Sequence, residues 1–495
     1  MTIKIRLFAV AIGIVGIAIG ISSCNTGSKS SKTGWNYNDP DFGGYEYLSN
    51  YNQETGPGLV LIQGGTFTMG RIVDDVRYDW NNVPKRVTIP SFYMDETEVT
   101  NANYREYLYW LKRVYVDYPQ VYRQALPDTL VWRDELAFNE PLVEYYLRHP
   151  AYNDYPVVGV SWAQANRYCE WRTDRVNELI LIDQGILEKD PNQRGANNFN
   201  SDSYLAGQYE GIVRQNLPDN DPNNETRRAR MEDGFFQPKY RLPTEAEWEF
   251  AAIGLIAEDE LIKNRKMYPW RGNYMRNDEK ANRGQIMANY ARGRGDYMGV
   301  SGSLNDGHGV TAPVKSFWPN DFGLYDMAGN VSEWVLDVYR PLSNQDVDEF
   351  RPFRGNVYTV KERDADGNIA EKDSLGRVPI RQMTAEENLN RSNYRRSDLR
   401  NFKDGDLESS INTLEDGEVD PKISTSKMYF QGEGDNKNGL TTRISDNARV
   451  YKGGSWRDRA YWLTPGTRRF LDEDGSRDDI GFRCAMSHLG KEAGL

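Results

Sequence analysis

The side chains of this chain best suited to covalent or metal chemistry are three cysteines and three histidines among 495 residues. The histidines, His149, His308 and His488, form neither an HxH nor an HxxxH pair, the spacings that direct two imidazoles to one metal. The sequence also contains no GxSxG turn, no Walker A loop and no convincing Ser/His/Asp set. We therefore expect structural histidines and no catalytic residue, which leaves the cysteines to be explained.

Cys24 follows an N-terminal segment that is typical of an exported lipoprotein. Lys4 and Arg6 form a basic start, and residues 7–21 form an apolar run that is short for a bilayer but suits a signal peptide. The run ends in ISSC, whose small residues match a bacterial lipobox with Cys24 as the lipid acceptor. We expect a signal peptide over residues 1–23 and lipidation of Cys24. The alternative is an ordinary signal peptide followed by an incidental cysteine.

The predicted lipid also gives a location. Several acyl chains on one cysteine anchor a protein firmly, whereas a single chain is marginal. Asn25, in place of aspartate, is compatible with sorting to the outer membrane, and no acidic run that would direct surface export follows it. We expect the periplasmic face of the outer membrane. The net charge of −12 argues against a nucleic-acid partner, because phosphate binding needs a basic face.

Cys169 and Cys484 are an even pair, which in an oxidising compartment is a candidate disulfide. Cys169 lies early in the globular region and Cys484 near its end, so a bridge would join the two ends of the fold. The chain-entropy model gives such a bridge roughly 5 kcal/mol of stabilisation. Two buried free thiols are the alternative.

Composition divides the remainder of the chain. A hydrophobic content of 38% in a chain of this length is enough for a substantial core. The predicted divisions are a lipidated, Ser/Gly/Asn-rich tether over 24–57, a globular domain over 58–487, polar insertions at about 185–238 and 340–447, and a tail over 488–495.

Helix and strand signals within the globular region are local. Thr100, Ser161 and Thr244 each precede a helical pattern, and the last two form capping boxes with Gln164 and Glu247. On the second helix Cys169 shares a side with Trp162 and Ala165, so it should point into the core. Strands are expected around a Gly64-Gly65 turn, over residues 86–94 with an interruption at Pro90, and over residues 357–361 leading to a hairpin turn at Asp366-Gly367.

Eight short motifs in a fixed order resemble the formylglycine-generating enzyme (sulfatase-modifying factor) family. They are GGTFTMG (64–70), VTIPSFYMDETEVTNANY (87–104), YPVVGVSWAQANRYCEW (155–171), YRLPTEAEWEFAA (240–252), YPWRGN (268–273), SFWPNDFGLYDMAGNVSEWV (316–335), KGGSW (452–456) and GFRCA (481–485). The resemblance implies a mixed α/β (α+β) fold of the complex C-type-lectin-like kind. It also implies that Cys169 pairs with Cys484, because the family joins the equivalent cysteines.

The resemblance fails at the residues that carry the family's chemistry. Its enzymes oxidise a substrate cysteine with copper held by two thiolates, the soft ligands that copper(I) prefers. The matching positions here are Asp458 and Leu463, and a carboxylate with an isobutyl group cannot form a dithiolate site. The resemblance therefore implies a pseudo-enzyme with no catalytic residue and no catalytic cofactor.

Structural calcium is a further property that the resemblance implies. One site would use Asn289 and Asp306 with the backbones of Tyr290 and His308, and a second would use Asn330 and Glu333 with the backbones of Gly329 and Val331. Such oxygen ligands suit a hard cation, but Asn330 and Glu333 could equally brace a turn. The run from Asp364 to Asn368 resembles an EF-hand opening but lacks its glycine, at Ile369, and its final glutamate, at Leu375, so we predict a simple turn.

A narrower resemblance is to the PorK/GldK lipoproteins of Bacteroidota, which share the lipobox, the length, the long insertion and the GFRCA ending. It implies a structural subunit of a periplasmic ring in the type IX secretion and gliding machinery. The implied partners are a PorN/GldN-type protein, further copies of the chain, the outer membrane, and an outer-membrane barrel protein such as PorG. We expect residues 340–447 to carry much of the partner contact, because insertions on a shared fold are where contacts are added.

Two other functions remain open from the sequence. One is an oxidase of the same family that uses other ligands, which the residues Asp458 and Leu463 oppose. The other is a lectin-like module that binds glycan, for which no aromatic platform can be assigned from sequence. Turnover of a cysteine peptide with copper would identify the first, and a glycan-binding screen the second.

Overall fold

The computed structural model describes residues 29–42, 45–49, 51–71, 81–221, 223–254, 266–293, 305–340, 349–350, 352–384, 387 and 444–490. Cys24, the signal segment and much of the predicted 340–447 insertion lie outside these residues. Within the described ranges, no helix has both the length and the apolar character needed to cross a bilayer.

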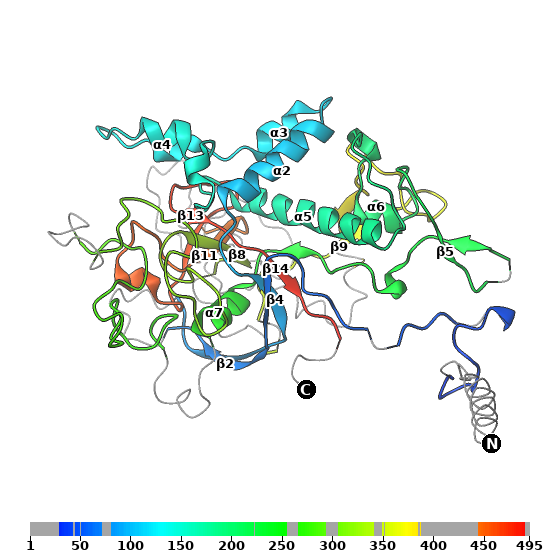
Figure 1. Cartoon of the computed structure of the whole chain (residues 1–495), viewed down its shortest axis with the longest axis horizontal. Coiled ribbons are helices and arrows are strands. Elements are labelled where there is room, and N and C mark those ends of the chain that lie inside the picture. The colour runs from blue at the N-terminus through cyan, green and yellow to red at the C-terminus, as the bar shows by residue number, and fades with distance from the viewer. Residues whose placement is uncertain are drawn as a thin grey trace, which may run out of the picture.

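Helices α2 to α6 gather on one side of the molecule, with the long helix α5 running across its centre, whereas α7 lies apart from them among the strands (Figure 1). The α-helices of the described residues are α2 (Asn101–Val114), α3 (Pro119–Ala125), α4 (Glu140–Tyr145), α5 (Trp162–Asp183), α6 (Ser201–Leu205) and α7 (Glu245–Ile253). Short 3-10 helices are η1 (Pro40–Phe42), η2 (Thr129–Trp132), η3 (Pro150–Tyr152), η4 (Gly195–Asn197), η5 (Met231–Asp233) and η9 (Ala460–Leu463).

Two four-stranded sheets form the framework. The first has the order β1 (Leu59–Ile62), β4 (Phe92–Asp95), β14 (Ala485–Ser487) and β7 (Tyr240–Arg241), and the second has the order β12 (Arg469–Asp472), β11 (Ala448–Lys452), β8 (Ser332–Val338) and β13 (Ile480–Gly481). Their neighbouring strands are antiparallel except β13 and β8. Two-stranded pairs are β2 (Gly65–Met69) with β3 (Lys85–Ile89), β5 (Leu217–Pro218) with β6 (Thr226–Arg227), and β9 (Thr359–Lys361) with β10 (Ile380–Gln382).

The expected interruption at Pro90 is confirmed, and it does more than bend one strand. The chain on its two sides belongs to two different sheets, β3 before it and β4 after it. A Cβ at Gly64 would lie 2.4 Å from the carbonyl oxygen of Ile89, so only glycine permits the close backbone approach there. The expected second strand after Gly64 is likewise confirmed, as β2.

The three helix starts read from the sequence are confirmed. Thr100 accepts a hydrogen bond from the Asn103 backbone at the start of α2, and Ser161 and Thr244 form reciprocal capping boxes at the starts of α5 and α7. Each cap satisfies amide donors that the first turn of a helix leaves free. On α5, which Ser161 caps, Ala165 and Cys169 are both buried, so Cys169 points into the core as the sequence predicts.

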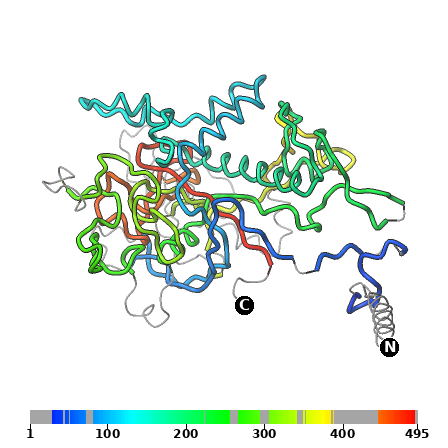
Figure 2. The backbone as a smooth tube through the Cα atoms, in the orientation of Figure 1, coloured from blue at the N-terminus to red at the C-terminus, as the bar shows by residue number. Residues whose placement is uncertain are grey.

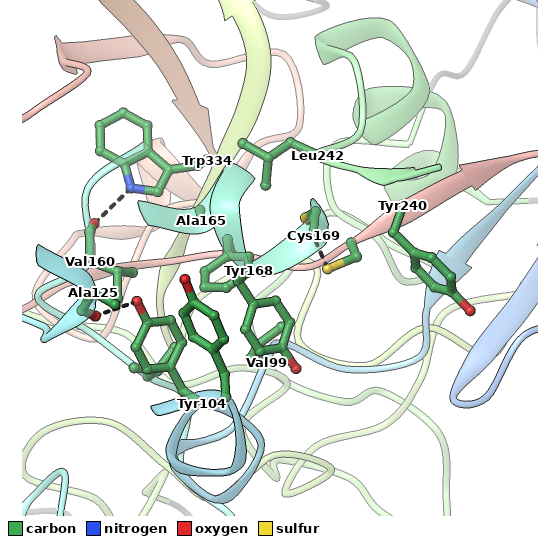
Figure 3. Packing of buried hydrophobic residues seen from close by; sticks show 14 of the residues in the cluster. Val99, Tyr104, Ala125, Val160, Ala165, Tyr168, Cys169, Tyr240, Leu242 and Trp334 are labelled. Atoms are coloured by element: carbon green, nitrogen blue, oxygen red, sulfur yellow. Dashed lines mark hydrogen bonds between the residues drawn. The ribbon is translucent and has the colours of Figure 1, made fainter. Parts of the chain in front are cut away.

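The core between the helices and the two sheets is aromatic (Figure 3). Tyr104 of α2 stacks on Tyr168 of α5 with ring centres 5.7 Å apart, and both pack edge-on against Phe482. The buried polar tips are satisfied: Tyr104 Oη donates to the Ala125 carbonyl at 2.8 Å, and Trp334 Nε1 to the Val160 carbonyl at 3.0 Å. These bonds give the buried rings fixed positions.

The polar segment 185–238 forms short helices and loops, as expected, around a small apolar cluster that includes Phe199, Tyr204 and Tyr209. The hairpin expected at Asp366-Gly367 is confirmed in a short form, with an antiparallel bridge between Arg363 and Ile369 and a hydrogen bond of 2.9 Å from the Asp364 amide to the Asn368 carbonyl. The strand before it, β9, pairs with β10. The turn predicted at Asp364 is confirmed, since its Oδ1 accepts the amides of Asp366 and Asn368.

The end of the predicted tether contacts the domain. Gln53 is buried, donates to the Gln237 side chain and the Ser487 carbonyl, and accepts from the Leu489 amide. The Arg227 guanidinium pairs with Glu46. Figure 2 shows the blue N-terminal segment running along the body before it extends away. A free tether would therefore have to lie ahead of these contacts.

Candidate functional site

The KGGSW segment makes a tight turn where β11 ends. Gly453 and Gly454 both have positive φ, at 93° and 69°. A Cβ at Gly454 would lie 2.8 Å from Leu463 Cδ1, so this position requires glycine for space as well as for conformation. The Trp456 amide donates to the Asn330 carbonyl at 2.8 Å and the Gly329 amide to the Gly453 carbonyl at 3.0 Å. The turn thus presses the 453–458 segment against residues 329–330 and against Leu463.

Asp458 is held in a two-pronged ion pair. Arg469 donates to both carboxylate oxygens, at 2.7 and 2.6 Å, and Ser455 Oγ donates to one of them at 2.7 Å. The same guanidinium lies over the rings of Tyr451 and Trp462, 4.8 and 4.7 Å from their centres. A bidentate, stacked and largely buried pair of this kind engages both carboxylate oxygens with donors of the protein itself.

A second acidic group extends the network. Ser455 Oγ also lies 3.2 Å from Asp479, which in turn accepts two hydrogen bonds from Arg477. Arg469 further donates to Ser332 Oγ at 2.9 Å, which ties β12 to β8. Ser455 has carboxylates beside it and no histidine, so it is not arranged as an activated nucleophile. The network joins strands and loops.

Leu463 is fully buried at the end of η9. It packs in an apolar cluster with Tyr268, Ile286, Ala288, Tyr290 and Ala328. The two positions that the resemblance assigned to copper ligands therefore hold an ion-paired carboxylate and a buried isobutyl group. The carboxylate offers only hard oxygen donors and the isobutyl group offers no donor atom, so the pair does not fit copper(I). Across the described residues, no three His, Cys, Asp or Glu side chains are arranged to hold a metal ion.

The three histidines lie on separate parts of the fold. His149 Nδ1 accepts the Ala151 amide at the start of η3, and the His488 ring packs on Tyr93 with centres 5.7 Å apart. His308 lies in a loop, where partial burial lowers the pKa of its imidazole. Their contacts are those of structural histidines.

The residues of the first predicted calcium site already take part in protein contacts. The Asn289 amide nitrogen donates to the Val310 carbonyl at 2.8 Å, and Asp306 Oδ1 accepts the His308 amide at 3.2 Å. Tyr290 is buried beside Leu463. These contacts do not converge on a cation cage, so the site stays a prediction.

The second predicted calcium site fits the ion poorly. Glu333 accepts two hydrogen bonds from Arg483, at 2.7 and 2.6 Å, and one from Trp248 Nε1 at 2.8 Å. Asn330 Oδ1 accepts the Ala312 amide at 2.8 Å. Gly329 and Val331 flank this turn, and both are buried. Calcium would have to displace a buried arginine, so the bracing role matches the contacts better.

Long-range buried ion pairs are the main feature that the sequence did not reveal. Lys452 is fully buried between Glu245 and Glu249 of α7, at 3.2 and 3.0 Å, and Arg468 adds a second contact to Glu245 at 2.7 Å. Burial alone would raise the pKa of Glu245, but Arg468 and Lys452 together lower it. These pairs fasten α7 to the C-terminal strands.

Three further buried carboxyl groups, those of Asp326, Asp337 and Glu98, have raised pKa values. Burial raises the pKa of Asp326 and of Asp337 to about 7. Burial, followed by the charges of Asp326 and Glu333, raises the pKa of Glu98 well above its usual range, and neither Glu98 oxygen has a hydrogen-bond partner among the described residues. A neutral Glu98 is the form that such surroundings favour.

Cys169, which Figure 3 labels in the aromatic core, meets Cys484 there. Both thiols are buried, and their sulfurs lie 3.2 Å apart. A disulfide needs about 2.05 Å between the sulfurs. The structure therefore brings the pair together as two thiols, and the bond itself stays a prediction. Burial, followed by the contact with Cys484, raises the pKa of the Cys169 thiol, which disfavours a reactive thiolate.

Two arginines among the described residues form ion pairs that the sequence did not predict. Arg469, in the motif GTRRF, and Arg483, in GFRCA, neutralise Asp458 and Glu333. The only sequence signal was an arginine within each C-terminal motif, and nothing in the sequence named its partner.

Comparison with known proteins finds relatives that are named as enzymes and relatives that are named as inactive. The chain is 27% identical over 296 residues to the formylglycine-generating enzyme of Mus musculus, a match that covers 56% of this chain and 58% of that enzyme. It is 25% identical over 302 residues to the inactive C-alpha-formylglycine-generating enzyme 2 of the same species, covering 58% of this chain and 70% of that protein. The chain thus spans little more than half the length of the active mouse relative.

A shorter and more similar match is the formylglycine-generating enzyme of Streptomyces coelicolor, at 42% identity over 101 residues, 20% of this chain and 27% of that enzyme. Among solved structures, PvdO from Pseudomonas aeruginosa covers 87% of this chain and 94% of its own at 17% identity, with a TM-score of 0.40. The family model of the sulfatase-modifying factor enzyme 1-like domain matches residues 45–384. On that match, the chain belongs to the formylglycine-generating enzyme-like (FGE-sulfatase) family.

Proposed function

We propose that this protein is a non-catalytic, lipid-anchored structural subunit of a periplasmic assembly beneath the outer membrane. The assembly that fits the sequence resemblance is the PorK/GldK ring of the type IX secretion and gliding machinery, built with a PorN/GldN-type partner and next to an outer-membrane barrel protein such as PorG. The observation that carries the non-catalytic part is the contact of Asp458 with Arg469 beside the buried Leu463.

Three features support a structural role over chemistry. At the copper-ligand positions, Asp458 is held in an ion pair and Leu463 lies in an apolar cluster. The family includes a relative described as inactive. The C-terminal strands are fastened by buried ion pairs, which rigidify a scaffold without offering a free nucleophile.

The non-catalytic part is tested by incubating the full chain with copper and a cysteine-containing substrate peptide. Mass spectrometry would report conversion of cysteine to formylglycine, with an active family member as the positive control. We expect no conversion. Turnover that disappears in an Asp458→Ala variant would overturn the proposal and favour the alternative, a degenerate oxidase, for which the likeness to the active mouse enzyme is the supporting observation.

The assembly part is tested by extracting the full lipoprotein in mild detergent and imaging what co-purifies. We expect a ring that contains a second type of subunit, and a lone monomer would count against the proposal. A Cys24→Ala variant should leave the membrane fraction if Cys24 carries the anchor. Metabolic labelling with palmitate should mark the wild type alone.

Deleting part of the long insertion tests its role more sharply than deleting all of residues 340–447. Its described part packs on the fold, because Asn198 donates to the Leu375 carbonyl and Gln208 to the carbonyls of Ile369 and Ala370. A deletion of residues 388–443 would spare these contacts. We expect it to weaken partner binding, and unchanged ring assembly together with unchanged partner binding would contradict the contact role of the insertion.

A further inference from the structure

A group of exposed aromatic rings follows closely after the residue that carries the proposed lipid. We call residues 29–42 and 45–49 the anchor-proximal segment. Within it, Trp35 is 62% exposed, Tyr45 is 66% exposed and Tyr47 is 44% exposed. Exposed apolar side chains scattered singly are ordinary, whereas a group of them marks a contact surface. Figure 1 shows the segment in dark blue, away from the body and on the side of β5.

The segment is folded locally, so its rings have defined places. The Ser30 amide donates to the Trp35 carbonyl at 2.8 Å, and the Gly34 amide donates to the Ser30 carbonyl at 2.9 Å. The Asn38 side chain donates to the Tyr47 carbonyl at 2.9 Å and accepts the Tyr47 amide at 2.8 Å. Asn38 has φ of 56°, a left-handed conformation that asparagine adopts more readily than most residues. These bonds make two linked turns.

The rings are of the type that favours a boundary between hydrocarbon and water. The Tyr37 ring packs against both exposed tyrosines, with centres 6.0 Å from Tyr45 and 4.8 Å from Tyr47. Tyrosine and tryptophan each combine an apolar ring with a polar O–H or N–H tip. Such side chains are enriched at the level of the lipid headgroups, where the ring and its tip meet different surroundings.

The length of chain between the lipid and the segment keeps these rings near the membrane. Lys29 follows Cys24 by five positions. A fully extended chain advances at most about 3.6 Å per residue, so Lys29 stays within about 18 Å of Cys24. Lys29 forms an antiparallel bridge with Asn36, the residue next to Trp35. Trp35 therefore stays close to any membrane that holds the lipid.

The charges near the rings do not select the headgroup. Lys29 and Lys32 are balanced by Asp39 and Asp41, and Glu46 pairs with an arginine of the body. A balanced set is neither drawn to anionic lipids nor repelled by them. A membrane contact made here would therefore depend on the rings and would be insensitive to salt.

We propose that Trp35, Tyr45 and Tyr47 lie in the headgroup layer of the membrane that holds the lipid of Cys24, as a second membrane contact of the chain. The inference rests on the proposed function, from which it takes the lipid on Cys24. A short linker gives the tethered group an effective concentration in the millimolar range, so even a weak contact is occupied. Acyl chains hold the protein at the membrane but let it turn, and the rings would limit that turning.

The far end of the segment is joined to the body, so the contact also sets which end of the body faces the membrane. Glu46 pairs with Arg227 of β6. A Cβ at Gly234, which ends η5, would lie 2.9 Å from Leu48 Cδ2 and 3.0 Å from Tyr51 Cδ2, so these side chains pack on that turn. The end of the body with β5, β6 and η5 therefore faces the membrane. Figure 1 shows α4 at the opposite end.

The first test is photo-cross-linking of the full lipoprotein in phosphatidylcholine vesicles, with benzoylphenylalanine in place of Trp35 or of Tyr45. The matched control places it at Phe138, which is 86% exposed in the loop between η2 and α4. All three positions are exposed, so the fold should be spared. We expect mass spectrometry to find lipid adducts from positions 35 and 45 at low and high salt alike, and none from position 138.

The second test separates a bound ring from one that is merely close to the lipid. About 20 Gly and Ser residues are inserted between Asn25 and Thr26, which leaves Cys24 and its neighbour unchanged. Chance encounters with lipid should then fall about tenfold, because the effective concentration falls as roughly the −3/2 power of linker length. A ring that binds the headgroup layer should keep its adduct yield.

The outcomes separate the inference from the function on which it rests. Lipid adducts from positions 35 and 45 that persist in the lengthened chain would support the contact. Adducts that fall about tenfold, or adducts with protein alone, would overturn the contact and leave the lipid anchor intact, the second of them in favour of a protein partner for the rings. A wild-type chain that carries no lipid and does not enter vesicles would overturn the anchoring itself.

Discussion

The region around Asp458 and the cleft of about 360 Å³ among α2, α5 and α6 both place arginines next to tryptophan and tyrosine rings, but they use the charge differently. Arg469 is stacked on Tyr451 and Trp462 and donates hydrogen bonds to Asp458 and Ser332. Arg167 and Arg377 of that cleft, in contrast, have no described carboxylate at ion-pair distance, and from farther away they only oppose the rise in the pKa of Glu170 that its burial causes. Arginine thus joins strands and loops by direct ion pairs in one region and only lines the wall of the other.

This difference teaches where the chain can change without losing its fold. Removing one member of a buried pair leaves an uncompensated charge and costs about 3–5 kcal/mol, whereas an exposed pair contributes about 0–1 kcal/mol. Substitutions in the inner network should therefore lower the free energy of unfolding more than substitutions of the cleft arginines.

The largest expected effect is at the cysteine pair. If the bond forms, Cys484→Ser should lower the free energy of unfolding by roughly 5 kcal/mol under oxidising conditions, because a loop of 315 residues is no longer closed in the unfolded chain. Urea unfolding with and without reductant measures the difference. Complete alkylation of both cysteines in the denatured, unreduced protein would contradict the bond.

Arg483→Met should cost about 3–5 kcal/mol, because it leaves Glu333 buried without its cation. The control is the double variant Arg483→Met with Glu333→Gln, which removes both charges and should recover part of the loss. Denaturant unfolding of the two variants measures this. If the single and double variants are equally unstable, packing rather than charge is responsible.

The raised pKa of Asp326 predicts that the free energy of unfolding depends on pH. Its pKa is raised to about 7 in the folded protein, so the folded state binds more protons than the unfolded state between about pH 4 and 7. The group therefore favours folding at low pH, and this contribution is lost as the pH rises toward 7, by at most about 4 kcal/mol. Asp326→Asn keeps the acceptor for the Lys315 amide and should flatten this part of the curve. Parallel curves for the two proteins would refute the shift.

Asp458→Asn should destabilise by about 2 kcal/mol, since it weakens a largely buried pair with Arg469 while keeping its shape. Thermal unfolding measures the loss, and the variant should still lack oxidase activity.

Arg377→Ala is the smallest effect, because the side chain forms no ion pair in the described structure. It should change the free energy of unfolding by less than about 0.5 kcal/mol, which urea unfolding measures. A stability loss as large as that of Asp458→Asn would remove the distinction between the two regions.

Sequence reasoning found the parts of this fold whose signals are local. Thr100, Ser161 and Thr244 cap helices through residues three positions away, so their motifs are visible in the sequence. The contact of Cys169 with Cys484 was available only because cysteines are few and the family resemblance paired them. The pairs of Lys452 with Glu245 and Glu249 join residues more than 200 positions apart, and charge alone does not select one partner among many.

The candidate site shows the same limit. The sequence identified Asp458 and Leu463 as departures from the family, but not the arginine and aromatic rings that receive Asp458. The exposed loop between η2 and α4 also escaped notice, because Leu136 and Phe138 are ordinary apolar residues until the fold shows them exposed.

The position of β14 has a consequence for synthesis. This strand lies between β4 and β7, and Ala485 pairs with Met94, far back in the chain. At about 5–20 residues per second, the ribosome needs roughly 20–80 s to travel from one to the other. Throughout that interval β4 has an open edge, and open edges recruit other chains. The nascent protein should therefore depend on a chaperone until its last strand arrives, even though the finished sheet shields that edge.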